Sequence, residues 1–137
     1  MKKVFVDTNI VLDLLSERVN YYEASQDLFT YAIDNNITLI VSTLTFANAH
    51  YILKEQLKLK KVRSSLRKFK TLVEVATFDD KILELSLEEE FKDFEDGIQY
   101  YIAIENSCEA LITRNKKDFK NSLIPILNAS EFMGLNN

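Results

Sequence analysis

Short apolar segments alternate with amphipathic segments along the whole 137-residue chain. The apolar segments are typical of buried strands, and the segments between them carry apolar residues at helical spacing. This alternation favours an α/β fold, in which helices cover both faces of a sheet of parallel strands. We therefore expect a three-layer α/β/α fold with a central parallel sheet of four to five strands.

The expected strands share runs of apolar or β-branched residues, and each is followed by a segment with the pattern of a helix. No linker or internal repeat interrupts the alternation, so we expect one domain over residues 1–137. The last strand should lie at an edge, because Pro125 cannot donate a ladder hydrogen bond. The strands are expected at residues 3–7, 37–42, 72–78, 110–113 and 124–128, and the helices at 10–16, 21–36, 45–59, 60–70, 79–90 and 93–107.

Composition points to a globular protein in a reducing compartment. Hydrophobic residues make up 47% and charged residues 28%, which excludes a disordered chain. The single Cys108 cannot form an internal disulfide and favours a cytoplasmic setting. Asp7 and Asp13 interrupt the first apolar run, so it does not resemble a signal peptide. No stretch is long and apolar enough to predict a membrane span, so we expect no membrane partner.

Charge is unevenly distributed, although the net charge is only -4. Residues 54–70 contain eight Lys or Arg and one acidic residue, Glu55. Residues 79–96 contain nine Asp or Glu and two Lys. Segregated charges create local fields that a net charge conceals. The basic segment is most simply a solvated face, and it is also a candidate surface for RNA or a protein partner.

Four aspartates are predicted to gather at one edge of the sheet. Asp7 ends the first strand, in VFVDTNIVLDLL, and Asp118 follows the fourth strand. Asp93 and Asp96 start a helix and, three residues apart, share one of its faces. Open parallel sheets place their sites at the carboxyl ends of the strands. We therefore expect these four carboxylates to converge, although each alone has an ordinary explanation as a helix cap, a helix N-terminal charge or a loop residue.

Converging carboxylates repel one another and raise the free energy of the fold. A hard divalent cation removes this repulsion, and oxygen ligands select Mg²⁺ or Mn²⁺. A cation held in this way can polarise a phosphoryl group, activate a water molecule and stabilise a leaving oxygen. The pattern therefore indicates hydrolysis of phosphodiester bonds.

Four segments together resemble the motifs of PIN-domain proteins in order and spacing: VFVDTNIVLDLL, VSTLTFANAHYIL, DFEDGIQYYIAI and LITRNKKDF. The likeness is to the bacterial toxin-like branch related to VapC ribonucleases, and it extends from Lys3 to about Asn128. It implies a three-layer fold and a metal-dependent endoribonuclease that cleaves single-stranded RNA with Mg²⁺ or Mn²⁺. It also implies a toxin–antitoxin pair, with a small antitoxin protein and a second copy of the chain as partners.

The resemblance also implies roles for individual residues. Asp7 and Asp96 match the metal-binding acids, and Asp93 and Asp118 match further catalytic acidic positions. Polar positions that line the site are matched by Thr8, Asn9, Asn48, Thr113 and Asn115, and the basic residues beside the last motif, Arg114, Lys116 and Lys117, are candidate RNA contacts.

Asn48 departs from the family pattern, which commonly has Glu at this position. Its spacing from Thr45 and Ile52 predicts that it faces the site. Asn can donate a hydrogen bond to Asp7 or offer a neutral oxygen to a metal, but it cannot act as a general base. A Glu introduced here is expected to strengthen cation binding.

Two functional hypotheses therefore stay open. The first is a toxin endoribonuclease. The second is a catalytically weak PIN-like module that binds RNA or a protein partner without cleavage, as Asn48 allows. A phosphoacceptor receiver domain ranks far below both, because the acidic residues around the first strand and the Lys after the last strand are not where it needs them.

Overall fold

The computed structural model describes residues 1–88 and 90–135. Its five strands form one sheet with the order β3-β2-β1-β4-β5, and every neighbouring pair is parallel. The expected fold class is confirmed, and so is the expected number of strands. The strands are β1 (Lys3–Val6), β2 (Thr38–Ser42), β3 (Glu74–Ala76), β4 (Leu111–Ile112) and β5 (Ile126–Leu127).

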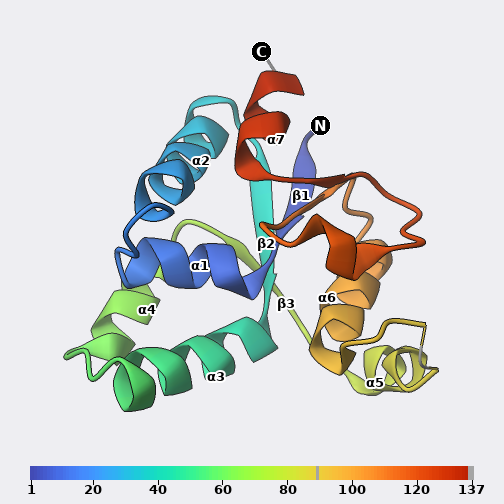
Figure 1. Ribbon diagram of the computed structural model, residues 1–137, viewed down its shortest axis with the longest axis horizontal. Coiled ribbons are helices and arrows are strands. Elements are labelled where there is room, and N and C mark those ends of the chain that lie inside the picture. Colours follow the sequence, from blue (N-terminus) through green and yellow to red (C-terminus); the bar gives the residue numbers. More distant parts are fainter. Residues whose placement is uncertain (89, 136–137) are drawn as a thin grey trace.

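Helices cover both faces of this sheet. Figure 1 shows α1 and α2 on one side of the strands and α5 and α6 on the other. The helices are α1 (Thr8–Leu15), α2 (Tyr22–Asp34), α3 (Thr43–Tyr51), the π-helix η1 (Ile52–Gln56), α4 (Val62–Lys70), α5 (Asp80–Ser86), α6 (Phe94–Glu105), the 3-10 helix η2 (Lys116–Phe119) and α7 (Ala129–Leu135).

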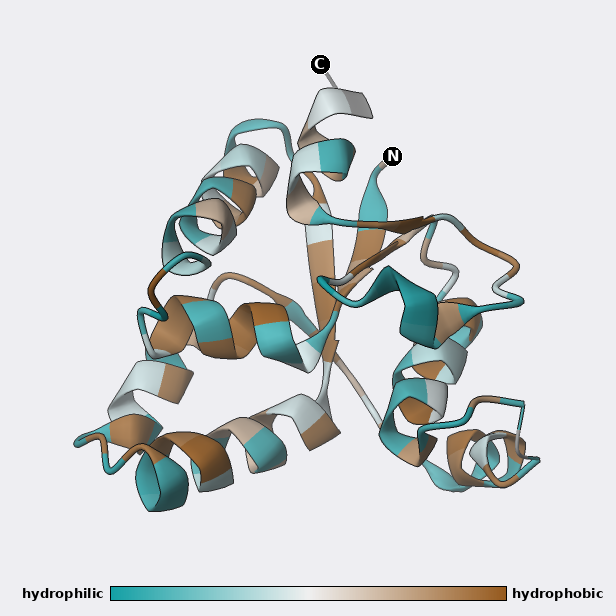
Figure 2. Ribbon diagram, in the orientation of Figure 1, coloured by the Kyte–Doolittle hydropathy of each residue, from teal (hydrophilic) through white to brown (hydrophobic). Residues whose placement is uncertain are grey.

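Alternate residues of the central strands supply two separate cores. Val4 and Val6 of β1 pack in the cluster that contains residues of α1, α2 and α7. Phe5, between them, packs in the cluster that contains residues of α5 and α6. This follows from the pleat, because successive strand residues point to opposite faces. Figure 2 accordingly shows hydrophobic strands at the centre and helices with alternating hydrophobic and hydrophilic bands.

A third apolar cluster joins α1 to the helices that follow β2. Leu12, Ala49, Leu53, Val62 and Leu66 are buried together. This packing places α3 and η1 beside α1, on the same edge of the sheet as the end of β1 (Figure 1).

The carboxyl ends of β1 and β4 are brought together by direct pairing. Val6 lies opposite Ile112, and the Asp7 amide donates to the Ile112 carbonyl at 2.9 Å. The residues that follow these two strands are therefore neighbours, although more than a hundred positions separate them in the sequence. The parallel order thus fixes where a site can form.

Several boundaries differ from the expected ones. The N-cap of α1 is Asp7, and that of α3 is Ser42, whose hydroxyl accepts from the Leu44 amide at 2.9 Å. The helix expected over residues 45–59 leaves α-helical geometry after Tyr51. The helix expected over residues 79–90 ends at Ser86, and residue 89 lies outside the described residues.

The short helices η2 and α7 were not expected from the sequence. They follow β4 and β5, strands of two residues each, and their own apolar periodicity is too brief to predict a helix. Within residues 1–88 and 90–135, no helix has both the length and the apolar character needed to cross a membrane. Cys108 is a buried free thiol, and burial raises its pKa to about 12.

Candidate active site

Asp7 is a buried carboxylate between the end of β1 and the start of α1. It is 4% exposed. Its two oxygens accept one hydrogen bond each, from the Gln99 amide at 3.0 Å and from the Thr113 hydroxyl at 2.7 Å. Among the described residues, no Lys or Arg forms an ion pair with it. Burial therefore raises the pKa of Asp7, and the bonds from Thr113 and Gln99 act in the opposite direction.

Gln99 orients this carboxylate and was missed by the sequence analysis. Its amide nitrogen donates to Asp7, and its amide oxygen accepts from the Thr8 amide at 2.9 Å and the Thr8 hydroxyl at 3.1 Å. The side chain is buried and joins α6 to the start of α1. Its position one helical turn after Asp96 was the signal that could have indicated it, because residues three apart share a face.

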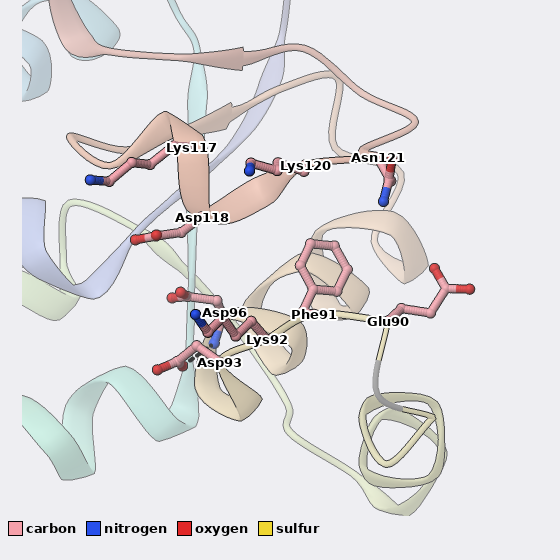
Figure 3. A pocket seen from close by; sticks show the side chains of 9 residues that line it. All are labelled: Glu90, Phe91, Lys92, Asp93, Asp96, Lys117, Asp118, Lys120 and Asn121. Atoms are coloured by element: carbon pink, nitrogen blue, oxygen red, sulfur yellow. Dashed lines mark hydrogen bonds between the residues drawn. The ribbon is translucent and has the colours of Figure 1, made fainter.

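Two aspartates at the start of α6, Asp93 and Asp96, have different roles. Asp93 is the N-cap, and its carboxylate accepts from the Asp96 amide at 3.0 Å. This bond satisfies one of the free amides that every helix N-terminus leaves. Asp96 makes no such capping bond and is directed toward the sheet edge. Figure 3 shows the carboxylates of Asp93, Asp96 and Asp118 pointing to the same side.

All four predicted aspartates line one cavity of about 280 Å³. The prediction that they come together at the sheet edge agrees with this arrangement. Their crowding affects Asp96 most: desolvation, followed by the charges of Asp93, Asp7 and Asp118 in that order, raises its pKa to about 7. A carboxyl group with such a pKa is a candidate for a functional role, because ordinary surface carboxyls do not show it.

Glu95 adds a fifth carboxylate that the sequence analysis did not identify. It lies at the cavity rim. The pKa of its carboxyl is raised, first by desolvation and also by the charges of Asp93 and Asp7, and the hydrogen bond from Asn48 acts in the opposite direction. The Asn48 amide donates to Glu95 at 2.7 Å. Asn48 therefore faces the site, as its spacing predicted, but its partner is Glu95 and not Asp7. The expectation that Glu at position 48 strengthens cation binding did not include this neighbour.

The other predicted polar residues also lie at the cavity. The cavity is lined by Thr8, Asn9 and Asn115. The backbone amide of Asn115 donates to the Thr113 hydroxyl at 3.0 Å. The Thr8 hydroxyl also lies 3.1 Å from that of Thr45. The Thr113 hydroxyl therefore links two hydrogen bonds: it accepts from Asn115 in the loop after β4 and donates to the Asp7 carboxylate.

The three predicted basic residues occupy different surroundings. Arg114 donates to the buried Asp13 at 2.7 Å and lies 3.8 Å above the Tyr21 ring, so its guanidinium is engaged away from the acids. Lys116 pairs with Glu131 at 2.9 Å. Lys117 lines a larger hollow that adjoins the acidic cavity, and Figure 3 shows its ammonium on the side to which the aspartates point.

A larger hollow of about 710 Å³ adjoins the acidic cavity and shares Asp93, Asp96 and Asp118 with it. Its wall includes two lysines that the sequence analysis did not single out, Lys92 and Lys120. Acidic and basic groups are thus side by side (Figure 3). The predicted basic segment lies elsewhere, around a separate hollow of about 650 Å³ lined by Lys54, Lys58, Lys60, Lys61 and Arg63.

The carboxylate oxygens of the cavity fit a hard cation that takes only one or two of its ligands from the protein. In the part of the chain that the structure describes, no three His, Cys, Asp or Glu side chains are arranged so that together they could hold a metal ion. Mg²⁺ is usually bound by one or two carboxylates, with water and substrate phosphate as its other ligands. The cavity offers Asp7 and Asp96 for that purpose, and both have pKa values raised by burial or by like charges.

Comparison with known proteins shows the family to which the chain belongs. Residues 3–117 match the PIN domain family. The chain is 30% identical over 136 residues to Ribonuclease VapC1 of Aquifex aeolicus, a match that covers 96% of this chain and 93% of the relative.

Solved structures share the fold at lower sequence identity. A toxin–antitoxin complex from Klebsiella pneumoniae is 23% identical with a TM-score of 0.67, over 92% of this chain and 97% of that one. A DNA-bound VapBC from Salmonella typhimurium is 16% identical with a TM-score of 0.71, over 94% and 99% of the two chains. At these low identities, the TM-scores show a likeness of fold alone. From its match over residues 3–117 and its curated relative, the chain belongs to the PIN domain family.

Proposed function

We propose that this chain is a metal-dependent endoribonuclease that cleaves single-stranded RNA. The observation that carries the proposal is Asp7: a carboxylate 4% exposed, without an ion pair to Lys or Arg among the described residues, in a cavity with three further aspartates. A charge in this setting is costly unless a cation meets it. The name of the Aquifex aeolicus relative, a ribonuclease, supports the choice of substrate.

Asp7 and Asp96 are the residues that would hold Mg²⁺ or Mn²⁺. When bound, the cation would polarise the phosphoryl group and lower the pKa of a water molecule. Gln99 and Thr113 fix the two oxygens of Asp7, so the carboxylate does not need to reorient on binding. Asp118 is exposed at the mouth and is our candidate acceptor for a proton from the attacking water.

The lysines of the adjoining hollow are suited to the RNA backbone. Lys92, Lys117 and Lys120 line it beside Asp118. Phosphates neighbouring the one that is cleaved carry negative charge, which the carboxylates would otherwise repel. We expect these lysines to hold the strand on either side of the reacting phosphate.

The test is cleavage of a panel of single-stranded RNAs by wild type and by Asp7→Asn, with Mn²⁺ and with EDTA. Wild type should cleave only with the cation, and Asp7→Asn should lose cleavage while keeping its circular dichroism spectrum. Undiminished cleavage by Asp7→Asn would refute the assignment.

A second candidate is a module that binds RNA without cleavage. It is favoured by the neutral Asn48 and by the lack, among the described residues, of three acids arranged to hold a metal. Fluorescence anisotropy with the same RNAs separates the two. Wild type that binds RNA but is as inert as Asp7→Asn supports the second candidate.

We further propose that the chain is a toxin with a small protein antitoxin and that it forms a dimer. The solved relatives from Klebsiella pneumoniae and Salmonella typhimurium are a toxin–antitoxin complex and a VapBC, respectively. The test is co-purification with the product of a small neighbouring gene, with light scattering for stoichiometry. Inhibition of cleavage by that product is the expected result.

A further inference from the structure

The larger hollow beside the acidic cavity has an aromatic side chain in its wall. Phe91 lines this hollow of about 710 Å³, whose wall also contains the three aspartates that the acidic cavity shares with it. In the view of Figure 3, the Phe91 ring stands between the carboxylate of Asp96 and the side chain of Asn121. Pockets that bind small molecules measure roughly 300–1,000 Å³, so the hollow has the size of a site for one nucleotide.

Three neighbouring rings hold the Phe91 ring in place. The centroid of the Tyr100 ring lies 4.7 Å away, and those of Tyr101 and Phe119 lie at 6.0 and 6.2 Å. Tyr100 is itself fixed, because it is buried and its hydroxyl accepts from the Leu123 amide at 2.9 Å. Tilted and edge-to-face contacts stabilise aromatic pairs beyond the effect of burial. Phe91 is therefore held before a ligand arrives, and because its side chain is only partly buried, part of the ring borders the hollow.

The wall of the hollow combines the two kinds of group that suit a nucleotide. Lys92, Lys117 and Lys120 offer ammonium groups to phosphate oxygens. The Phe91 ring offers a flat apolar surface, and proteins that bind single-stranded RNA stack its unpaired bases on such rings. A base and a phosphate that enter the hollow together therefore each find a partner of suitable chemistry.

We propose that Phe91 is a stacking platform for an unpaired base of the RNA strand, an inference that rests on the proposed function. The hollow shares Asp96 and Asp118 with the acidic cavity, so the base belongs to a nucleotide beside the phosphate that is cleaved. Every base has an aromatic face, so the platform contributes affinity for single strands without selecting a sequence. In a duplex the bases are already stacked on one another, and no base face is available to Phe91.

Tryptophan fluorescence tests the proposal, because the chain contains no Trp. Phe91→Trp places the fluorophore at the platform, and a base stacked on it should quench its emission. The probes are a short single-stranded RNA, an abasic oligomer with the same ribose-phosphate backbone, and the RNA duplex. Titration in EDTA at low salt prevents metal-dependent cleavage and preserves the lysine contacts. Quenching should be seen with the strand that has unpaired bases and be absent with the other two probes.

The matched control places the fluorophore away from the hollow. Ile33 is 58% exposed on α2, which lies on the other side of the sheet from α6 (Figure 1). Ile33→Trp should therefore keep its emission with all three probes. Quenching of both variants by RNA would show nonspecific contact with the surface and would overturn the inference.

Affinity is measured on the same probes by fluorescence anisotropy. Phe91→Leu keeps an apolar side chain without a flat face and should bind single-stranded RNA about tenfold more weakly than wild type. Its affinity for the abasic oligomer should equal that of wild type, because the lysines remain. Phe91→Tyr keeps the ring and should bind both probes as wild type does. The melting temperature of each variant shows that it is folded at the temperature of the assay.

Two further results overturn the inference. One is equal quenching of Phe91→Trp by the abasic oligomer, because the ring then responds to the backbone alone. The other is Phe91→Leu that binds RNA as wild type does, or that binds RNA and the abasic oligomer more weakly by the same factor, since that loss shows a merely structural role. Binding by wild type that does not depend on bases leaves the proposed function standing, whereas wild type that binds no RNA in EDTA or in Mg²⁺ contradicts both.

Discussion

Replacing Asp96 by Asn should stabilise the protein in metal-free buffer, and the gain should depend on pH. The cavity raises the pKa of Asp96 from its ordinary value of 3.8 to about 7, first by desolvation and then by the charges of Asp93, Asp7 and Asp118. A difference of that size corresponds to at most about 4 kcal/mol of unfolding free energy. Asp96 is partly exposed, and solvent screening reduces the expected effect to roughly 1–3 kcal/mol.

The sign follows from proton binding. Between the unfolded and the folded pKa, the folded state holds the proton more tightly than the unfolded state does. Wild type therefore loses stability as pH rises from about 4 to about 7, and the loss is complete above the folded pKa. Asn cannot ionise, so Asp96→Asn lacks this contribution. The two proteins should have similar stability at about pH 4 and differ most at about pH 8.

Thermal unfolding in EDTA across this pH range measures the difference. At about pH 8 the melting temperature of Asp96→Asn should exceed that of wild type by roughly 3–12 °C. Asp27→Asn, at an exposed position in the middle of α2, is the matched control and should follow wild type. Added Mn²⁺ should stabilise wild type more than Asp96→Asn. Parallel pH profiles for the two proteins would refute the argument that the aspartates repel one another in the cavity.

Further variants test individual side chains. Arg114→Met removes the 2.7 Å partner of the buried Asp13, which keeps Arg18 at 3.3 Å, and should lower the unfolding free energy by about 1.5–3 kcal/mol in urea titrations. Gln99→Leu leaves the Thr8 amide without its partner and should cost about 1–3 kcal/mol by the same measurement. Lys117→Ala should raise KM for RNA with a smaller effect at high salt, whereas Lys116→Ala, whose side chain is paired with Glu131, should not; equal KM values would contradict the proposed RNA path.

Most of the architecture could be predicted from the sequence because it depends on patterns that local physics enforces. Buried strands of a parallel sheet are apolar on both faces, and this distinguished residues 3–7 and 37–42 from their surroundings. The convergence of Asp7 with Asp118 then followed from the rule that sites lie at the carboxyl ends of strands. Element ends were less predictable, since α5 stops at Ser86 where the acidic residues that follow still suit a helix.

The roles of individual side chains could be predicted only in part, because they depend on contacts across the sheet edge. Glu95 appeared as one more acid in an acidic segment, and only the position of α3 shows that it meets Asn48. Arg114 appeared to be available for RNA, yet the buried Asp13 binds it. Neither partner lies near in the sequence, so no local pattern could indicate these pairs.

The sheet order has a consequence for the chain while it is being synthesised. Asp7 is made first, but its hydrogen-bond partners Gln99 and Thr113 are separated from it by 92 and 106 positions. The last acid of the cavity, Asp118, lies later still in the 137-residue chain. A growing chain therefore cannot assemble the cavity until most of its length has left the ribosome. Any activity that depends on this cavity therefore cannot begin before Asp118 has left the ribosome.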